Sequence, residues 1–218
     1  LINQMGRKAD PAARERLLAE AEHIIHLRGY HRTSMDEIAE SCGMSKANLF
    51  HYYKSKEDLG LAVLDAKISD YQKRRVSPLC DCLDPVSAVE KMFENAAKLF
   101  RSNGCKAGCF VANIALEMSD VNDAFRQKAG LFFKEWSRRV AERLAEAQKE
   151  GFFGRSLDPR SAAESVVSLY EGAVMLARTQ RDPSIFARVG RAAASLLEQH
   201  KLVTRRHKTM GPKTPCGC

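Results

Sequence analysis

Four consecutive rings, the Phe-His-Tyr-Tyr of residues 50–53, are followed at once by Lys54 and Lys56. Neighbouring residues of a helix point about 100° apart, so four adjacent rings cannot all enter one core. Some of them must face water or a partner, and no acidic residue lies between Ser45 and Lys56. Basic, polar and aromatic side chains on one short helix suit a nucleic-acid partner. The structural alternative, a satellite hydrophobic cluster beneath a loop, does not explain the missing acids.

A second chemically suggestive stretch is segment 103–110, which contains Cys105 and Cys109. Lys106 adjoins Cys105, and Cys109 is expected at a helix start. Both a cation and a helix N-terminus stabilise the thiolate, which is the reactive form of cysteine. The Gly-x-x-x-Gly spacing leaves room for an electrophile, or for a disulfide if the two Cα atoms come within about 4.4–6.8 Å. The plain alternative is that Cys109 is a small buried apolar residue.

Two other roles of cysteine, zinc binding and catalysis, have little support in the sequence. None of the seven cysteines forms a C-x2-C pair, so we expect no structural zinc, and we expect no cofactor. No His or carboxylate stands at a helical spacing that would activate either thiol, so we do not expect an enzyme. A cytoplasmic helical thiol-dependent enzyme or redox protein remains the alternative.

The compartment follows from what the chain lacks. The N-terminal residues have no apolar signal-peptide region, and no run of eighteen apolar residues exists for a membrane span. We therefore expect a cytoplasmic protein with reduced thiols and no membrane partner.

Charge alone is a weak guide to the partner. The net charge is +8, and residues 201–218 contribute five of it with five basic residues and no acid. Residues 1–56 hold nine Lys or Arg against seven Asp or Glu, a surplus of only two. A nucleoid-type protein held by charge alone is therefore disfavoured. The composition of 201–218 predicts a disordered basic tail.

Helix starts punctuate the chain. Asp-Pro occurs at residues 10, 84, 158 and 182, each time before a helix-forming run. Asp accepts a free N–H at the N-cap, and Pro at the next position loses a donor that has no partner there. No stretch shows sustained two-residue alternation, so the sequence predicts an all-α protein of about nine helices. The predicted helices span residues 11–28, 34–41, 46–52, 56–75, 85–102, 109–119, 122–150, 159–180 and 183–200.

The second and third predicted helices form a helix-turn-helix. Ser34-x-x-Glu37 is a capping box, and Gly43 ends the helix 34–41 in a left-handed conformation. Ser45 then caps the helix 46–52, and two helices joined by so short a turn make this motif. The inward stripe of the first of these helices is Met35, Ile38, Ala39 and Cys42.

The phase of the helix 46–52 identifies its outer face. If Leu49 and Tyr53 face the core, Ala47 and His51 point away from it, with Lys46, Asn48, Phe50 and Tyr52 on the flanks. Such a small, polar and aromatic face fits a major groove. Lys56, at the start of the next helix, is placed to hold a phosphate.

These residues resemble a known family. Gly29-Tyr30, 33-TSMDEIA-39, 43-GMSK-46 and 49-LFHYYKSKEDL-59 are similar to the N-terminal domain of the TetR/AcrR transcriptional regulators. The resemblance implies a three-helix DNA-binding domain over residues 1–56 and a ligand-binding and dimerisation domain over residues 57–200. It also implies a homodimer, a palindromic double-stranded DNA operator and a small-molecule effector.

The family's DNA-contact positions map onto a defined set of this chain's residues. One departure is Phe50, where the family usually has Tyr, so one phosphate-bonding hydroxyl is absent. The implied DNA-contact residues are Thr33, Ser34, Ser45, Lys46, Ala47, Asn48, Phe50, His51, Tyr52 and Lys56.

Helices 159–180 and 183–200 carry small and apolar residues together, as a four-helix bundle formed by two chains would require. They could instead bury these faces within one chain, and the resemblance favours the dimer.

Polar groups and rings in the helices 85–150 could form a ligand pocket or a plain core. In addition, Gly108-Cys109 ahead of Ala115-x-Glu117 resembles a branch of the family in which some members sense electrophiles or oxidants. The sequence thus predicts a repressor released by a ligand or by thiol modification. The candidate ligand-binding or redox-sensing residues are Cys105, Cys109, Phe110, Asn113, Glu117, Phe133, Trp136 and Tyr170.

Overall fold

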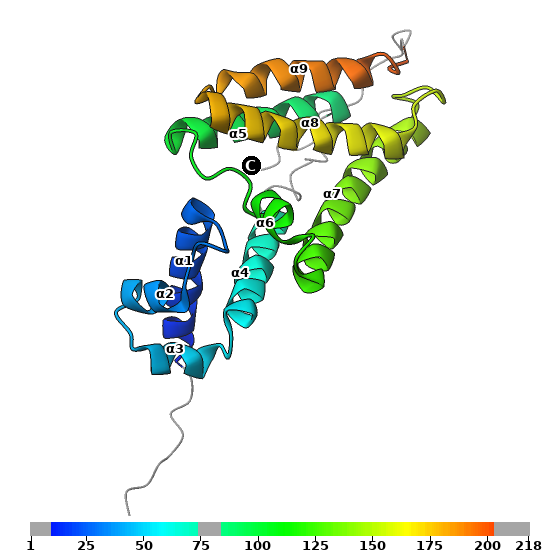
Figure 1. The fold of residues 1–218 in the computed structure, drawn as a ribbon. Coiled ribbons are helices and arrows are strands. Elements are labelled where there is room, and N and C mark those ends of the chain that lie inside the picture. Colours follow the sequence, from blue (N-terminus) through cyan, green and yellow to red (C-terminus); the bar gives the residue numbers. More distant parts are fainter. Residues whose placement is uncertain (1–9, 74–83, 203–218) are drawn as a thin grey trace, which may run out of the picture. The chain divides into compact units, whose positions relative to one another are not determined.

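The computed structural model describes residues 10–73 and 84–202, and these ranges contain nine α-helices (Figure 1). Their only extended pairing is an isolated bridge between Phe153 and Lys201. The predicted all-α class is therefore confirmed. None of the described helices combines the length and the apolar content that a bilayer crossing requires. The helices are α1 (Pro11–Arg28), α2 (Met35–Ser41), α3 (Lys46–Tyr52), α4 (Lys56–Tyr71), α5 (Pro85–Ser102), α6 (Phe110–Met118), α7 (Asp123–Lys149), α8 (Pro159–Gln180) and α9 (Ser184–Glu198).

Three of the four Asp-Pro pairs start helices as predicted. Asp10, Asp84 and Asp158 are N-caps whose carboxylates accept backbone N–H groups two residues on. The fourth pair differs, because Asp182 accepts the N–H of Ser184 at 2.9 Å and α9 begins at that serine. The predicted helix 56–75 is observed as α4, and its expected end beyond residue 73 lies outside the described residues, as does most of the tail 201–218.

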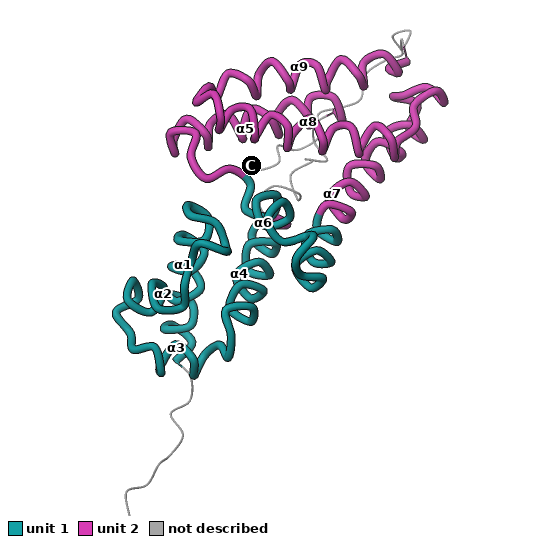
Figure 2. Tube along the Cα trace, in the orientation of Figure 1, with its two compact units in different colours: residues 1–70, 109–132 teal, residues 71–108, 133–218 magenta. Residues whose placement is uncertain are grey.

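The chain divides into two compact units (Figure 2). Unit 1 comprises residues 1–70 and 109–132, and unit 2 comprises residues 71–108 and 133–218. This division differs from the predicted boundary at residue 56, because α4, α6 and the start of α7 pack with the first three helices. The functional division into DNA-binding and ligand-binding domains stays a prediction.

Unit 1 is closed by contacts between segments far apart in sequence. The Tyr30 and Phe125 rings lie 4.9 Å apart, and both press on Gly60 of α4, where an added Cβ would stand 2.5 Å from Tyr30. Glu22 on α1 contacts Lys67 on α4 at 3.0 Å and His26 at 3.1 Å. These contacts hold α4 and α7 against α1 and the turn that follows it.

Unit 2 consists of α5, α8, α9 and the second part of α7, with α5, α8 and α9 lying side by side (Figure 1). Rings fill its interior: Tyr170 lies 5.4 Å from Phe93 and 5.1 Å from Trp136, centroid to centroid. Gly190 of α9 lets that helix approach α5, because a Cβ there would stand 2.8 Å from the Cβ of Phe93.

This close approach predicts that Gly190→Ala destabilises the protein. Overpacking of a fixed core typically costs about 1–3 kcal/mol, so the free energy of unfolding should fall by that amount. Urea unfolding at matched protein concentration measures it. Gly130→Ala on α7 is the control, since a Cβ there meets nothing within 4 Å. That change should be neutral or stabilise by up to about 1 kcal/mol. Equal stability of both variants would contradict the packing described.

A second prediction concerns the α1–α4 contact. Burial alone would raise the pKa of Glu22, but hydrogen bonds and charges from His26 and Lys67 lower it from 4.5 to about 2. Because the folded-state pKa lies below the unfolded one, the stabilisation is present above the unfolded pKa. It is lost as pH falls towards about 2.

Glu22→Gln should therefore be less stable than wild type near pH 6, by an amount on the order of 1 kcal/mol after allowance for partial exposure. The difference should shrink as pH approaches about 2. Urea titrations at several pH values test this, with Glu40→Gln on α2 as the control for loss of a carboxylate. A difference that is constant with pH would show that Glu22 is not held in its charged form.

Candidate nucleic-acid interface

The α2–α3 corner has the geometry of a helix-turn-helix. Ser34 Oγ accepts the N–H of Glu37 at 3.1 Å, and the Glu37 carboxylate accepts the N–H of Ser34 at 2.8 Å, which completes the predicted capping box. Gly43 has a φ of 63°, and the N–H of Met44 returns to the carbonyl of Ala39 at 3.0 Å. Ser45 Oγ accepts the N–H of Asn48 and caps α3. Both helix starts and the turn between them are thus fixed by local hydrogen bonds.

The predicted phase of α3 is confirmed. Leu49 and Tyr53 are buried, whereas Ala47 and His51 are exposed. The exposed candidate residues are Ser34, Ser45, Lys46, Ala47, Asn48 and His51, and the half-buried ones are Phe50, Tyr52 and Lys56.

Lys46 forms an ion pair with an acidic residue of α2. Its Nζ lies 2.8 Å from the carboxylate of Asp36 on α2, and both side chains are more than half exposed. Exposed pairs of this kind contribute only about 0–1 kcal/mol. The pair can therefore open at low cost when a phosphate or a base edge competes for the ammonium.

Two of the implied DNA-contact residues form hydrogen bonds within the protein that the sequence did not indicate. Thr33 is 1% exposed and its hydroxyl donates to the carbonyl of Gly29 at 2.8 Å, and a contact of this residue with DNA stays a prediction. A Thr hydroxyl that bonds four residues back closes a turn. Lys56 Nζ donates to the carbonyl of His31 at 3.2 Å and lies 4.4 Å from the centroid of the Tyr30 ring. Burial lowers the pKa of Lys56, and the charges of Glu117 and Glu37 act to raise it.

Glu117 has a partner that sequence reasoning missed. It was predicted among pocket residues, but its carboxylate accepts the N–H groups of Tyr30 at 2.8 Å and His31 at 2.6 Å. No local pattern signals a contact across more than eighty residues of chain. The residue therefore lies against the end of α1, within unit 1.

The sensor candidates are shared between the units. Cys105, Phe133, Trp136 and Tyr170 belong to unit 2, whereas Cys109, Phe110, Asn113 and Glu117 belong to unit 1. Because the chain passes from one unit to the other after Gly108, a disulfide between Cys105 and Cys109 stays a prediction.

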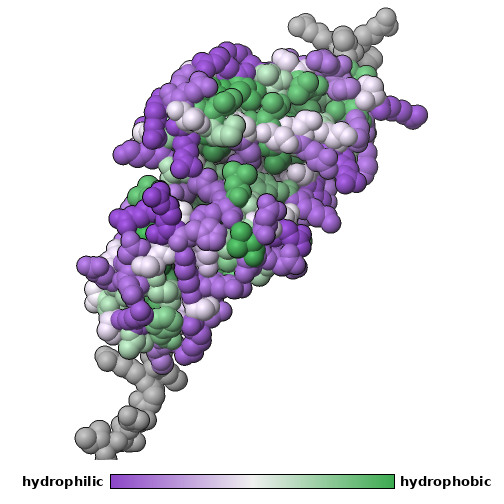
Figure 3. Space-filling model, viewed as in Figure 1, coloured by the Kyte–Doolittle hydropathy of each residue, from purple (hydrophilic) through white to green (hydrophobic). Residues whose placement is uncertain are grey.

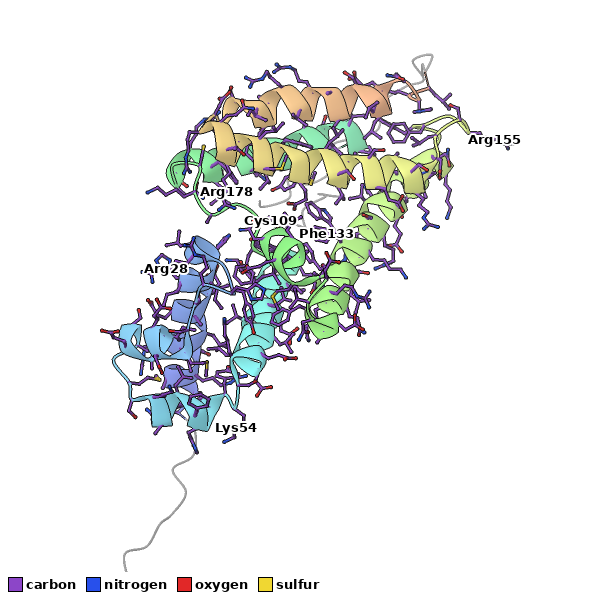
Figure 4. The ribbon with its side chains drawn as sticks, viewed as in Figure 1. Arg28, Lys54, Cys109, Phe133, Arg155 and Arg178 are labelled. Atoms are coloured by element: carbon purple, nitrogen blue, oxygen red, sulfur yellow. The ribbon has the colours of Figure 1, made fainter. Side chains whose placement is uncertain are left out.

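Both thiols are buried. Cys109 is the N-cap residue of α6 (Figure 4), which confirms its predicted place at a helix start. Cys105 has a φ of 56°, and its carbonyl accepts Nη1 of Arg181 at 2.6 Å. Gly104, Ala107 and Gly108 also have positive φ, and because glycine adopts it freely, the strain in segment 104–108 lies at Cys105 and Ala107. Cys42, Cys105 and Cys109, the cysteines of the described ranges, are thiols.

The pocket candidates of unit 2 lie in two settings. Trp136 and Tyr170 are buried in the ring cluster, as a plain core requires. Phe133 is half-buried and lines an open groove of about 810 Å³ between α7 and α8, together with charged residues such as Arg138 and Glu164. A ligand site at these residues stays a prediction.

Two family models match the chain. Residues 17–63 match that of the bacterial regulatory proteins of the tetR family. Residues 85–192 match that of the C-terminal domain of LmrA/YxaF-like transcriptional regulators.

Individual relatives agree with these models. The transcriptional regulator AcuR of Cereibacter sphaeroides is 29% identical over 166 residues, which cover 76% of this chain and 75% of AcuR. The transcriptional repressor NemR of Escherichia coli is 24% identical over 185 residues, covering 81% of this chain and 89% of NemR.

Solved structures share the fold. A regulatory protein TetR from Rhodobacter sphaeroides superposes with a TM-score of 0.76 at 27% identity, covering 84% of this chain and 97% of that one. The reduced form of E. coli NemR superposes with a TM-score of 0.75 at 20% identity, covering 85% and 97%. Helix-turn-helix geometry, matching domains and shared fold lead to one conclusion: the chain belongs to the TetR family of DNA-binding transcriptional regulators.

Proposed function

We propose that this regulator is a homodimeric repressor that acts in the cytoplasm. It binds a palindromic double-stranded operator and is released by thiol modification or by a small-molecule effector. The observation that carries the proposal is the outer face of α3. There Lys46, Ala47, Asn48 and His51 are exposed and no acid of α3 lies among them, while Leu49 anchors the opposite face. A helix that presents short polar and basic side chains in this way can enter a major groove.

The dimer is proposed to form through α8 and α9. Met175 on α8 is 60% exposed and Leu196 on α9 is 45% exposed, and Leu176 and Ala192 are exposed as well. Figure 3 shows hydrophobic residues gathered over these two helices. Two packed helices that expose apolar side chains can bury them against the same pair in a second copy. A palindromic operator follows from the two-fold symmetry of such a dimer.

Cys109 is proposed as the sensing thiol, with Cys105 as its partner. Cys109 starts α6, where the helix dipole favours thiolate, and the strained segment 104–108 precedes it. Similarity to NemR, a repressor solved in a reduced form, supports a thiol-linked response. The second route is a small molecule in the groove that Phe133 lines. The family is one of regulators rather than enzymes, so we propose no catalytic activity.

The DNA-reading face is tested by Lys46→Ala and His51→Ala. A direct base contact contributes about 1–3 kcal/mol, so each change should weaken operator binding roughly tenfold or more. The operator is obtained first by selecting genomic fragments that the wild-type protein retains, and affinity is then measured by fluorescence anisotropy.

Lys91→Ala on α5 is the matched control, since it removes an exposed lysine that belongs to unit 2. Circular dichroism and gel filtration should show a folded dimer in every variant. Should both α3 variants bind as tightly as wild type, α3 is not the reading helix.

The thiol route predicts that a mild oxidant or alkylating agent releases the wild-type protein from its operator. Peroxide would oxidise the Cys109 thiolate to a sulfenic acid with loss of hydroxide, and condensation with the Cys105 thiol would form a disulfide and release water. Cys109→Ser should bind DNA and resist release, whereas Cys42→Ser should respond like wild type. The measurement is a binding titration with and without the reagent. Release of Cys109→Ser by the reagent, or no effect on any variant, would leave only the effector route.

A further inference from the structure

The turn between α1 and α2, residues 29–33, is held more tightly than its length suggests. Gly29 ends α1 with a φ of 91°, and the N–H of Thr33 bonds to the carbonyl of Tyr30 at 3.2 Å. The Thr33 hydroxyl returns to the Gly29 carbonyl at 2.8 Å. Ser34, the N-cap of α2, follows directly, so the shape of this turn sets where α2 begins.

The side chain of Glu117, on α6, forms two hydrogen bonds to this turn. One carboxylate oxygen accepts the N–H of Tyr30 at 2.8 Å, and the other accepts the N–H of His31 at 2.6 Å. Two bonds from one rigid carboxylate to adjacent N–H groups fix the orientation of the peptide between them as well as its distance. Hydrogen bonds to an ionised acceptor are also stronger than those between neutral groups.

The residues around the turn allow the Glu117 hydrogen bonds and add further contacts to the same turn. A Cβ at Gly29 would stand 3.2 Å from a Glu117 oxygen, so a glycine suits the approach as well as the positive φ. Lys56 binds the same two residues from α4: its Nζ donates to the His31 carbonyl and lies over the Tyr30 ring. The Glu117 carboxylate thus accepts hydrogen bonds from two N–H groups of this turn, while the Lys56 ammonium donates one to the carbonyl of His31.

We propose that Glu117 is a positioning residue for operator binding, which holds the turn 29–33 and thereby the start of α2 in the orientation that DNA requires. Glu117 need not touch DNA itself. The inference rests on the proposed function, because it takes the α2–α3 corner as the DNA-reading element. Without the Glu117 hydrogen bonds, only a fraction of the protein would hold α2 in the orientation that binds the operator. The apparent operator affinity would then be reduced by that fraction.

The test compares Glu117→Ala with Leu116→Ala, the neighbouring change at a side chain that is 87% exposed. Glu117→Ala should raise the operator Kd by about tenfold, whereas Kd for a scrambled duplex of equal length should change by less than about twofold. Leu116→Ala should match wild type on both. Glu117→Gln keeps one acceptor and should lie between, and it carries the test if the alanine variant does not fold.

Hydrogen exchange supplies a readout that a purely structural role would not move selectively. The amides of Tyr30 and His31 should exchange faster in Glu117→Ala, while the α2 amide of Ile38, bonded to Ser34, should keep its protection. Three outcomes would overturn the proposal: unchanged operator affinity, unchanged exchange of the two amides, or a parallel loss of both DNA affinities with general loss of protection.

Lys46→Ala on the same operator separates this inference from the proposed function. If Lys46→Ala loses affinity and Glu117→Ala does not, only the positioning role fails. If Lys46→Ala binds like wild type, the proposed reading face fails, whatever Glu117→Ala does.

Discussion

The proposed DNA-reading surface depends on how a seven-residue helix is held in place. Isolated helices shorter than about 12–15 residues are marginal in water, so α3 must be stabilised by its surroundings. Leu49 in the middle of α3 is fully buried, and Ser45 caps the first turn of the helix. Gly43, with its positive φ, sets the direction of the turn that precedes α3. Because Leu49 and Tyr53 fix the rotation of the helix, they also decide that Ala47 and His51 face outward. The chemistry of the outer face is therefore a consequence of an apolar anchor on the other side.

Local rules explain why so much of this arrangement could be predicted from the sequence. Caps, glycine turns and helix phase depend on residues three or four positions apart, and the three Asp-Pro starts at residues 10, 84 and 158 follow from such rules. The features that the sequence did not show all involve other interactions. The Thr33 hydroxyl donates to the Gly29 carbonyl, Lys56 Nζ donates to the His31 carbonyl, and α6 packs in unit 1. The sequence around Glu117 does not indicate its hydrogen bond to Tyr30, because the two residues come together only when the chain has folded.

The position of α6 brings the two proposals onto one element. Cys109 stands at its start and Glu117 in its last turn, and eight residues of helix span about 12 Å. Cys109 is buried, so an added group or a new disulfide cannot form without displacing its neighbours. If thiol modification shifts the first turn of α6, we expect the shift to reach Glu117 and its hydrogen bonds to the Tyr30 and His31 amides. On this proposal, thiol chemistry at Cys109 alters the α1–α2 turn without any change in the proposed DNA-contact residues themselves.

The charges around the proposed reading surface are expected to favour sequence-specific binding over binding to any duplex. Residues 1–56 carry a surplus of only two positive charges, and Asp36 lies 2.8 Å from Lys46. Any duplex offers phosphates, but an acid beside the basic reader repels them and weakens binding that depends on charge alone. The Asp36–Lys46 pair itself opens at low cost, so the effect of Asp36 is to reduce the positive charge that the surface presents to phosphates. If α3 reads the operator as proposed, we expect discrimination between operator and other DNA to arise from the fit of the α3 face rather than from net charge.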